Sequence, residues 1–183
     1  MKGYLELAIP ASAPAVLWTF GRNIPIDQFS QYRHLDDIAK IVKSDLTGLL
    51  RDALGTEYVI QPDVTVGRSD PLGVPYLHAS VSCKWTIRSD RVQNARHEAN
   101  VLIRHRRGRC PHIVVVTAEP LPSRLASIAR GTGEIDCTYH LALPELVAAV
   151  KNVGNHLQCR VLDELVANGR LADLADLPDA LLF

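Results

Sequence analysis

Apolar positions along the first third of the chain recur at helical spacing. Between residues 25 and 54 they follow each other at steps of three and four, which places them on one face of a helix. The positions are Leu35, Ile38, Ile41, Val42, Leu46, Leu49 and Leu50. Gly55 follows directly and is typical of a helix end. This pattern predicts a helical region over residues 25–54.

The middle of the chain changes to β-branched residues. Residues 58–66 predict a strand disturbed by Pro62, and residues 77–85 predict a second strand. The turn-rich connection over residues 67–75 is short enough for the two strands to pair as a hairpin. Ser89 and Asp90 are suitable caps for a helix that runs to about Arg104 with a single apolar stripe.

The last part of the chain alternates between the two patterns. The apolar run HIVVVT over residues 112–117 predicts a buried central strand. A short helix over 122–130, a strand over 135–141 and helices over 143–153 and 156–167 follow. This order predicts an α/β fold, a mixed central sheet flanked by helices, in one domain over residues 24–183. Residues 1–23 have a weaker pattern, with Pro10 and Pro14 before a short strand candidate over 16–20.

Composition narrows the class of protein. The chain has 183 residues, of which 47% are hydrophobic and 22% charged, and this excludes a wholly disordered or collagen-like chain. No apolar stretch reaches the roughly 18 residues of a membrane helix. The four cysteines form no Cys-x-x-Cys pair, so neither a zinc site nor a disulfide framework is indicated. We therefore expect a reduced, cytoplasmic protein without a membrane partner.

Charge is balanced overall but divided along the chain. Lys and Arg number 20, as do Asp and Glu. Residues 84–109 nevertheless carry eight basic and two acidic side chains, a net charge of +6, whereas residues 134–183 carry eight acids and three bases, a net charge of −5. A local basic stripe can bind phosphates, although on charge alone a solvated helix face is the simpler interpretation.

Two acids and a lysine lie at adjoining positions of the expected sheet and helix. Asp63 follows a proline near the middle of one predicted strand, Lys84 ends the next, and Glu98 lies on the following helix. Carboxylate oxygens are suitable ligands for Mg²⁺, which offsets charge on a phosphodiester, and an ammonium can bind the scissile phosphate. Each residue alone is more often a solvated surface group, so these three residues by themselves are only modest evidence for phosphodiester hydrolysis.

The segment after Lys84 suggests sequence-specific contacts with DNA. Arg88 and Arg91 flank Asp90 at the start of a predicted helix. Arginine matches the major-groove acceptors of guanine, and aspartate accepts a hydrogen bond from the amino group of cytosine. The alternative is a capping aspartate with surface salt bridges, which would contribute about 1 kcal/mol at most.

Two long runs of the chain resemble the NgoMIV-type restriction endonucleases. They are LHASVSCKWTIRSDRVQNARHE over residues 77–98 and PHIVVVTAEPLPSRLASIARGTGEIDCTYH over residues 111–140. The NgoMIV-type endonucleases are type II enzymes that recognise sites with a CCGG core. The resemblance extends from about Gln28 to the C-terminus. It implies the restriction-endonuclease-like PD-(D/E)xK fold, with the second acid moved from the strand to the next helix. Ser82 stands at the usual position of that acid, and Glu98 replaces it.

The resemblance also implies roles for individual residues. Asp63 and Glu98 would be catalytic carboxylates that bind Mg²⁺, with the backbone carbonyl of Cys83 as a further ligand, and Lys84 would be the catalytic lysine. The DNA-binding residues would be Arg88 and Arg91 for the core guanines, Asp90 for the cytosines and Arg124 for an outer G·C pair. The implied activity is that of a type II site-specific deoxyribonuclease acting on double-stranded DNA at GCCGGC, as a homotetramer or a dimer.

The resemblance also sets an expectation for the N-terminal part. Family chains carry a substantial segment, with helices that pack on the domain, before the point at which this sequence begins. We therefore expect an exposed apolar face built from the helical region over residues 35–50 and the sheet, self-association or low solubility, and weak or absent cleavage. Two alternatives stay open. One is a non-catalytic DNA-binding or oligomerising remnant, and the other is a nuclease without sequence specificity, which Arg88, Asp90 and Arg91 disfavour.

Overall fold

The computed structural model describes all residues except 55–59, 70–72, 132 and 183. In the first half the elements are α1 (Lys2–Ser12), β1 (Trp18–Gly21), η1 (Ile26–Gln28), η2 (Ser30–Tyr32), α2 (Arg33–Ser44), α3 (Leu49–Leu54), β2 (Val64–Arg68), β3 (Tyr76–Lys84) and α4 (Ser89–His105). In the second half they are β4 (His112–Thr117), α5 (Pro122–Ala129), β5 (Cys137–His140), α6 (Leu143–Val153), α7 (His156–Ala167), β6 (Leu171–Asp173), η3 (Leu174–Asp176) and α8 (Leu177–Ala180).

Within the described residues, six strands form one mixed sheet in the order β1-β2-β3-β4-β5-β6. β1, β2 and β3 pair antiparallel, and β3 to β6 pair parallel. The predicted hairpin of β2 and β3 is therefore confirmed. The parallel half needs helical crossovers, which α4, α5 and the pair α6–α7 supply. The predicted α/β class, a mixed sheet flanked by helices, is confirmed.

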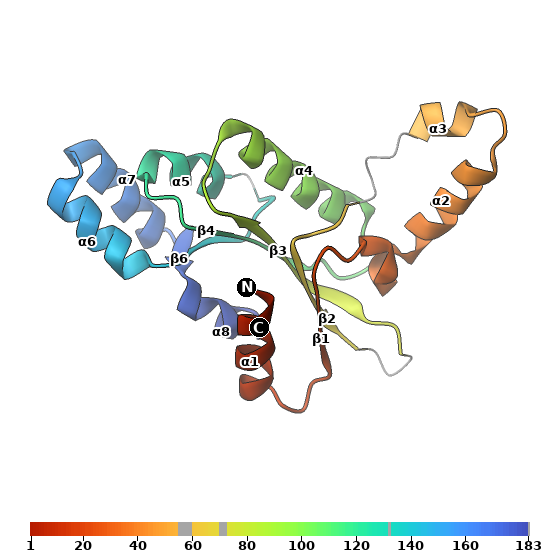
Figure 1. Ribbon diagram of the computed structural model, residues 1–183, viewed down its shortest axis with the longest axis horizontal. Helices are drawn as coiled ribbons and strands as arrows, with labels where there is room; N and C mark the ends of the chain where they lie inside the picture. Colours follow the sequence, from red (N-terminus) through yellow and green to blue (C-terminus); the bar gives the residue numbers. More distant parts are fainter. Residues whose placement is uncertain (55–59, 70–72, 132, 183) are drawn as a thin grey trace.

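Each face of the sheet is covered by a different set of helices (Figure 1). On one face α4 packs through Ala95, Ala99 and Leu102 onto Ile113 and Val115 of β4. On the other face the shorter α1 and α8 cover the alternate residues of the same strands, which include Val64, Val81, Val114 and Val116. Because successive strand residues point to opposite faces, this alternation also fixes which polar side chains lie beneath α4.

Several boundaries differ from those that the sequence predicts. The helical region over 25–54 divides into η1, η2, α2 and α3, and its predicted end at Gly55 lies outside the described residues. β2 begins only at Val64, so Asp63 precedes the strand, because Pro62 has no N–H to give to a ladder. α4 begins at Ser89, with Arg88 as its N-cap and no capping bond from a side chain, so the predicted capping by Ser89 and Asp90 is wrong.

The structure adds elements that the sequence pattern does not indicate. α1 continues through Pro10, and its Leu5 and Ile9, four residues apart, are wholly buried against the sheet and α8. β6 has three residues and α8 four, which is too short for a recognisable period. β1, by contrast, overlaps the strand candidate that the sequence indicates over residues 16–20. None of the described helices is long and apolar enough to cross a membrane.

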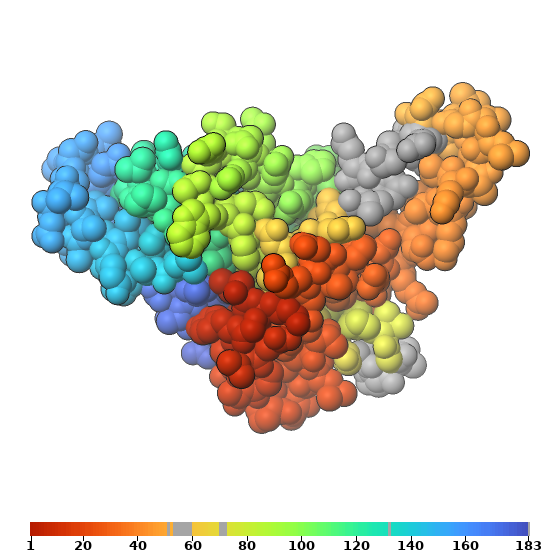
Figure 2. Space-filling view, viewed as in Figure 1, coloured from red at the N-terminus to blue at the C-terminus, as the bar shows by residue number. Residues whose placement is uncertain are grey.

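The helices α2 and α3 project from the body of the molecule as an arm (Figures 1 and 2). Only Leu35 of α2 is buried. Further along the arm Ile41, Leu46, Leu49 and Leu50 are exposed. Apolar side chains of the region over residues 35–50 are therefore exposed, on this arm and not on a face shared with the sheet.

We expect the packing of α1 to contribute measurably to stability. Ile9→Ala removes a fully buried side chain and should lower the free energy of unfolding by about 2–5 kcal/mol. Leu7→Ala, on the 79% exposed side chain of the same helix, should change it by no more than about 0.5 kcal/mol. Urea unfolding of both variants measures the difference, and equal losses would show that α1 does not pack as described.

Candidate active site

An ion pair joins the end of β3 to the residue before β2. The Lys84 Nζ lies 2.9 Å from the Asp63 Oδ2, and the Lys84 side chain is 15% exposed. The Cys83 N–H donates to the same Asp63 oxygen at 2.7 Å. Val64 pairs with Val81, so continuing the antiparallel register by one residue sets Asp63 opposite Ser82. The register of the hairpin thus brings these groups together although about twenty residues separate them in the chain.

Glu98 reaches the same place from α4. It lies three residues after Ala95 and one before Ala99, so it belongs to the stripe of α4 that faces the sheet. Beneath it the Ser82 hydroxyl donates to the Glu98 Oε2 at 3.4 Å. Ser82 and Lys84 are two residues apart on β3 and therefore point to the same face. The structure thus brings Asp63, Lys84 and Glu98 to one end of the sheet beneath α4.

The charges in this cluster affect one another. Burial raises the pKa of the Glu98 carboxyl, and the nearby Asp63 charge raises it further, while Lys84 opposes both effects. Two carboxylates thus share one ammonium in a half-buried place. A group that brings additional positive charge to the two acids would relieve this repulsion.

Cys83 contributes to the cluster through its backbone. Burial raises the pKa of its thiol, and the Asp63 charge acts in the same direction, so the thiol stays neutral. The N–H and C=O of a strand residue point to the same side, and the Cys83 N–H points to Asp63. The Cys83 carbonyl oxygen therefore points to the same side of β3, the side on which Asp63 lies.

The donors fit a magnesium ion. Among the described residues, no group of three or more His, Cys, Asp and Glu side chains is placed to hold a metal ion. The ligands that this cluster offers are two carboxylates, of Asp63 and Glu98, and the backbone carbonyl of Cys83. Mg²⁺ commonly takes one or two carboxylates and completes its coordination with waters and phosphate oxygens. The excess negative charge on Asp63 and Glu98 suits such an ion.

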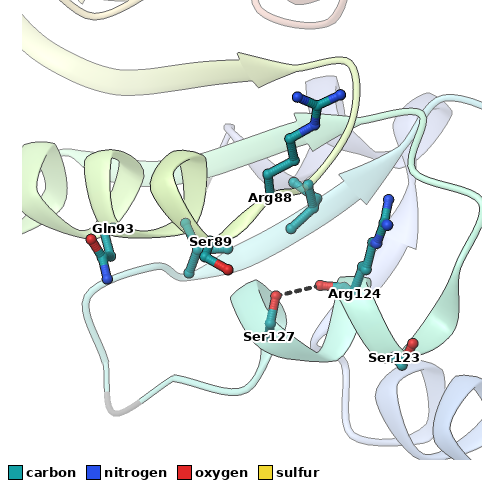
Figure 3. A pocket seen from close by; sticks show the side chains of 8 residues that line it. Arg88, Ser89, Gln93, Ser123, Arg124 and Ser127 are labelled. Carbon is teal, nitrogen blue, oxygen red and sulfur yellow. Dashed lines mark hydrogen bonds between the residues drawn. The ribbon is translucent and has the colours of Figure 1, made fainter.

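A second group of predicted residues lines a surface cavity of about 750 Å³, whose wall includes Ile87, three residues after Lys84. Arg88, the N-cap of α4, and Arg124, on the first turn of α5, both contribute to its wall. Figure 3 shows the two guanidinium groups extending in the same general direction from their separate helices. Serine and glutamine side chains complete the polar part of the lining: Ser89, Gln93, Ser123 and Ser127.

Asp90 and Arg91 occupy the first turn of α4. Asp90 is exposed and makes no capping bond to the helix. The Nη1 of Arg91 instead donates to the carbonyl and hydroxyl of Thr86, each at 3.1 Å, which fixes the side chain against the segment after Lys84. The interpretation of Asp90 as a helix cap therefore loses its support.

One acid of this region is not among the site residues that the sequence predicts. Glu119 is 0% exposed, and its two carboxylate oxygens accept the N–H groups of Ile87 at 2.8 Å and Leu121 at 3.1 Å. A signal for it exists in the sequence, because an acid two residues after the buried run HIVVVT falls at the carboxyl end of a parallel strand, where sites commonly form.

Comparison with known proteins identifies the family. The model of the NgoMIV restriction enzyme family matches residues 18–73 and 68–183. A curated relative, the type II restriction enzyme NgoMIV of Neisseria gonorrhoeae, is 45% identical over an alignment of 183 residues, which covers 85% of this chain and 63% of the relative. The chain thus spans less than two thirds of the length of that relative. It belongs to the NgoMIV restriction enzyme family.

A solved structure gives a weaker likeness. It is the restriction endonuclease PspGI–substrate DNA complex, with a TM-score of 0.36 and 13% sequence identity. The match covers 57% of this chain and 39% of that chain. A likeness at this level has no bearing on the site.

The raised pKa of Glu98 leads to a pH-dependent difference in stability. Because the folded state disfavours the charged form, Glu98 costs stability once it ionises, and this cost grows as the pH rises from about 4.5 through its raised pKa. In metal-free buffer Glu98→Gln should therefore raise the thermal midpoint at pH 7.5, and the gain should shrink towards pH 4.5. Asp163→Asn, on an exposed position of α7, should show no such trend. If Glu98→Gln raised the thermal midpoint equally at both pH values, the raised pKa of Glu98 would be contradicted.

Proposed function

We propose that the chain carries the catalytic and DNA-binding part of a Mg²⁺-dependent type II restriction endonuclease. Its substrate is double-stranded DNA with a CCGG core, of the form GCCGGC. The observation that carries this proposal is the Asp63–Lys84 ion pair, with Glu98 of α4 close to it. Lys84 lies four residues before Arg88, which lines the neighbouring cavity. Family membership supports the proposal.

Each residue of the cluster has a proposed part in hydrolysis. Asp63, Glu98 and the Cys83 carbonyl would hold Mg²⁺. When bound, the ion offsets negative charge on the phosphodiester and makes water a better nucleophile. The Lys84 ammonium, which Asp63 holds 2.9 Å away, would donate a hydrogen bond to the scissile phosphate and orient the attacking water. Ser82 steadies Glu98 from below.

Base selection is proposed for the neighbouring cavity. The Arg88 and Arg91 guanidiniums would bind core guanines, Asp90 would accept from the cytosine amino groups, and Arg124 would contact the outer G·C pair. Of these, Arg88, Asp90 and Arg124 are exposed. Because GCCGGC reads identically on both strands, two copies related by a two-fold axis would each read one half-site. The apolar arm of α2 and α3 supports association of the chain into a homo-oligomer, a dimer or the family's tetramer.

Asp63→Asn tests the catalytic assignment. The amide oxygen can still accept the Cys83 N–H, so the fold should persist while the negative charge is lost. We expect Mg²⁺-dependent cleavage of a supercoiled plasmid with GCCGGC sites to fall by more than the roughly 10–100-fold typical of groups that only support a ligand. Binding of the cognate duplex should change little.

Asp136→Asn is the matched control, because its carboxylate likewise accepts a strand N–H, from Ile113 at 2.8 Å, at the other end of β4. It should cleave at the wild-type rate. Wild-type cleavage by Asp63→Asn would refute the assignment. Specific binding by the unmodified chain without any cleavage would instead favour a non-catalytic DNA-binding protein.

Arg88→Ala tests base selection. Loss of a bidentate contact with guanine should weaken binding of the GCCGGC duplex by about 1–3 kcal/mol and leave binding of random duplexes nearly unchanged. Arg107→Ala, on the exposed basic run after α4, should reduce binding of both duplexes alike if it contacts phosphates. Fluorescence anisotropy at several salt concentrations measures both, and equal losses for Arg88→Ala on the two duplexes would rule out base readout by Arg88.

A further inference from the structure

Glu119 is the most deeply buried acid near the site and has no part in the proposed hydrolysis. It lies on the connection between β4 and α5 and is 0% exposed. Burial of a carboxylate is costly unless hydrogen bonds or cations compensate for the lost water. Its partners therefore indicate what the buried carboxylate does.

Those partners belong to the segments on either side of the cavity. One carboxylate oxygen, Oε2, accepts the Ile87 N–H at 2.8 Å, and the other, Oε1, accepts the Leu121 N–H at 3.1 Å. Ile87 directly precedes Arg88, and Leu121 is the N-cap of the helix that carries Arg124. The Glu119 N–H itself donates to the Thr117 Oγ1 at 3.1 Å, which anchors the acid to the last residue of β4. One carboxylate thus ties the start of α4 and the start of α5 to the sheet.

The same carboxylate acts on one of the two arginines directly. The Arg124 Nη1 lies 3.8 Å from the Glu119 Oε2, and the Arg124 side chain remains 53% exposed. Glu119 therefore attracts one edge of the guanidinium from below and leaves the rest of it open to the cavity. The backbone of Arg88 is held through Ile87, whose side chain is 1% exposed in the core.

We propose that Glu119 is a positioning residue for specificity, which sets the relative placement of Arg88 and Arg124 over a DNA site. The inference rests on the proposed function, because it assigns to both arginines the reading of guanines. A guanine contact with two hydrogen bonds requires a guanidinium placed to within about 0.5 Å, and residues that lock its surroundings provide this precision. Glu119 contacts no base itself and acts through the two arginines.

Asp173 provides a matched comparison. Its carboxylate also accepts two backbone N–H groups, from Ala175 at 2.8 Å and Leu143 at 3.0 Å, and it also joins a strand end to a helix start. It lies at β6, at the edge of the sheet, and is not part of the cavity lining. If such carboxylates serve folding alone, Glu119→Gln and Asp173→Asn should behave alike.

The test measures the binding of the full chain to three duplexes without divalent metal, by fluorescence anisotropy. They contain GCCGGC, ACCGGT with a changed outer pair, and GGCGCC with a scrambled core. Glu119→Gln removes the charge and one of the two acceptors. We expect it to lower the preference for GCCGGC over each of the other two duplexes by about tenfold, the effect of one hydrogen bond to a charged group. Affinity for GGCGCC should stay within about twofold, and Asp173→Asn should keep the full preference.

Two further measurements separate positioning from folding. Amide hydrogen exchange at Ile87 and Leu121 should accelerate in Glu119→Gln, while exchange at the Ile113 amide of β4 should not. The double variant Glu119→Gln/Arg124→Met should lose no more of the preference for the outer pair than Arg124→Met does, because both changes act on one contact. Unchanged exchange, or an unchanged preference despite faster exchange, would overturn the proposal.

The outcomes also distinguish this inference from the function on which it rests. If the wild-type chain does not prefer GCCGGC to GGCGCC, the proposed function itself fails. If the wild type discriminates and Glu119→Gln does so equally well, only the role of Glu119 fails. Should Glu119→Gln not fold, Glu119→Asp, which keeps the charge but is too short to reach both N–H groups, is expected to show the same loss. Unfolding of both variants would assign Glu119 to folding alone and overturn the proposal.

Discussion

Two carboxylates lie close together at one end of the sheet, and the Lys84 ammonium pairs with one of them. This cluster is the constraint around which the molecule is organised. Asp63 and Glu98 repel each other, and burial adds to the cost of ionising Glu98. Lys84 offsets part of that cost through its 2.9 Å contact with Asp63. A structure that keeps such a cluster must hold it rigidly from several sides, and a divalent cation would convert the repulsion into binding affinity.

The sheet provides that rigidity. Asp63 is fixed by the register of the β2–β3 hairpin, Lys84 by the alternation along β3, and Glu98 by the sheet-facing stripe of α4. The segment that leaves Lys84 leads within four residues to Arg88, so the cluster and the arginine cavity share one edge. Glu119 extends the same arrangement to α5, because its buried carboxylate holds the backbone on both sides of the cavity.

How far the sequence predicts this arrangement depends on the range of each interaction. The helices over 143–153 and 156–167 agree with the structure because their helical pattern is long and uninterrupted. The strand over residues 112–117 agrees because its apolar run is continuous. That Asp63, Lys84 and Glu98 lie close together follows from the predicted hairpin and the family resemblance. α1 was missed because Pro10 and Pro14 suggest an interruption, whereas burial of Leu5 and Ile9 stabilises the helix. Glu119 has a signal in its place two residues after the buried strand, but its partners are backbone N–H groups, which the sequence does not reveal.

We propose that the Asp63–Lys84–Glu98 cluster hydrolyses DNA at the site that the neighbouring arginines select. Sequencing of the DNA ends that the purified chain produces, with Mg²⁺, from a plasmid library containing every six-base sequence tests both parts at once, and detects even a small cleaved fraction. We expect ends concentrated at CCGG-core sites, GCCGGC foremost, that disappear when Mg²⁺ is removed. Ends distributed without regard to sequence, or an equal yield of ends without Mg²⁺, would contradict it.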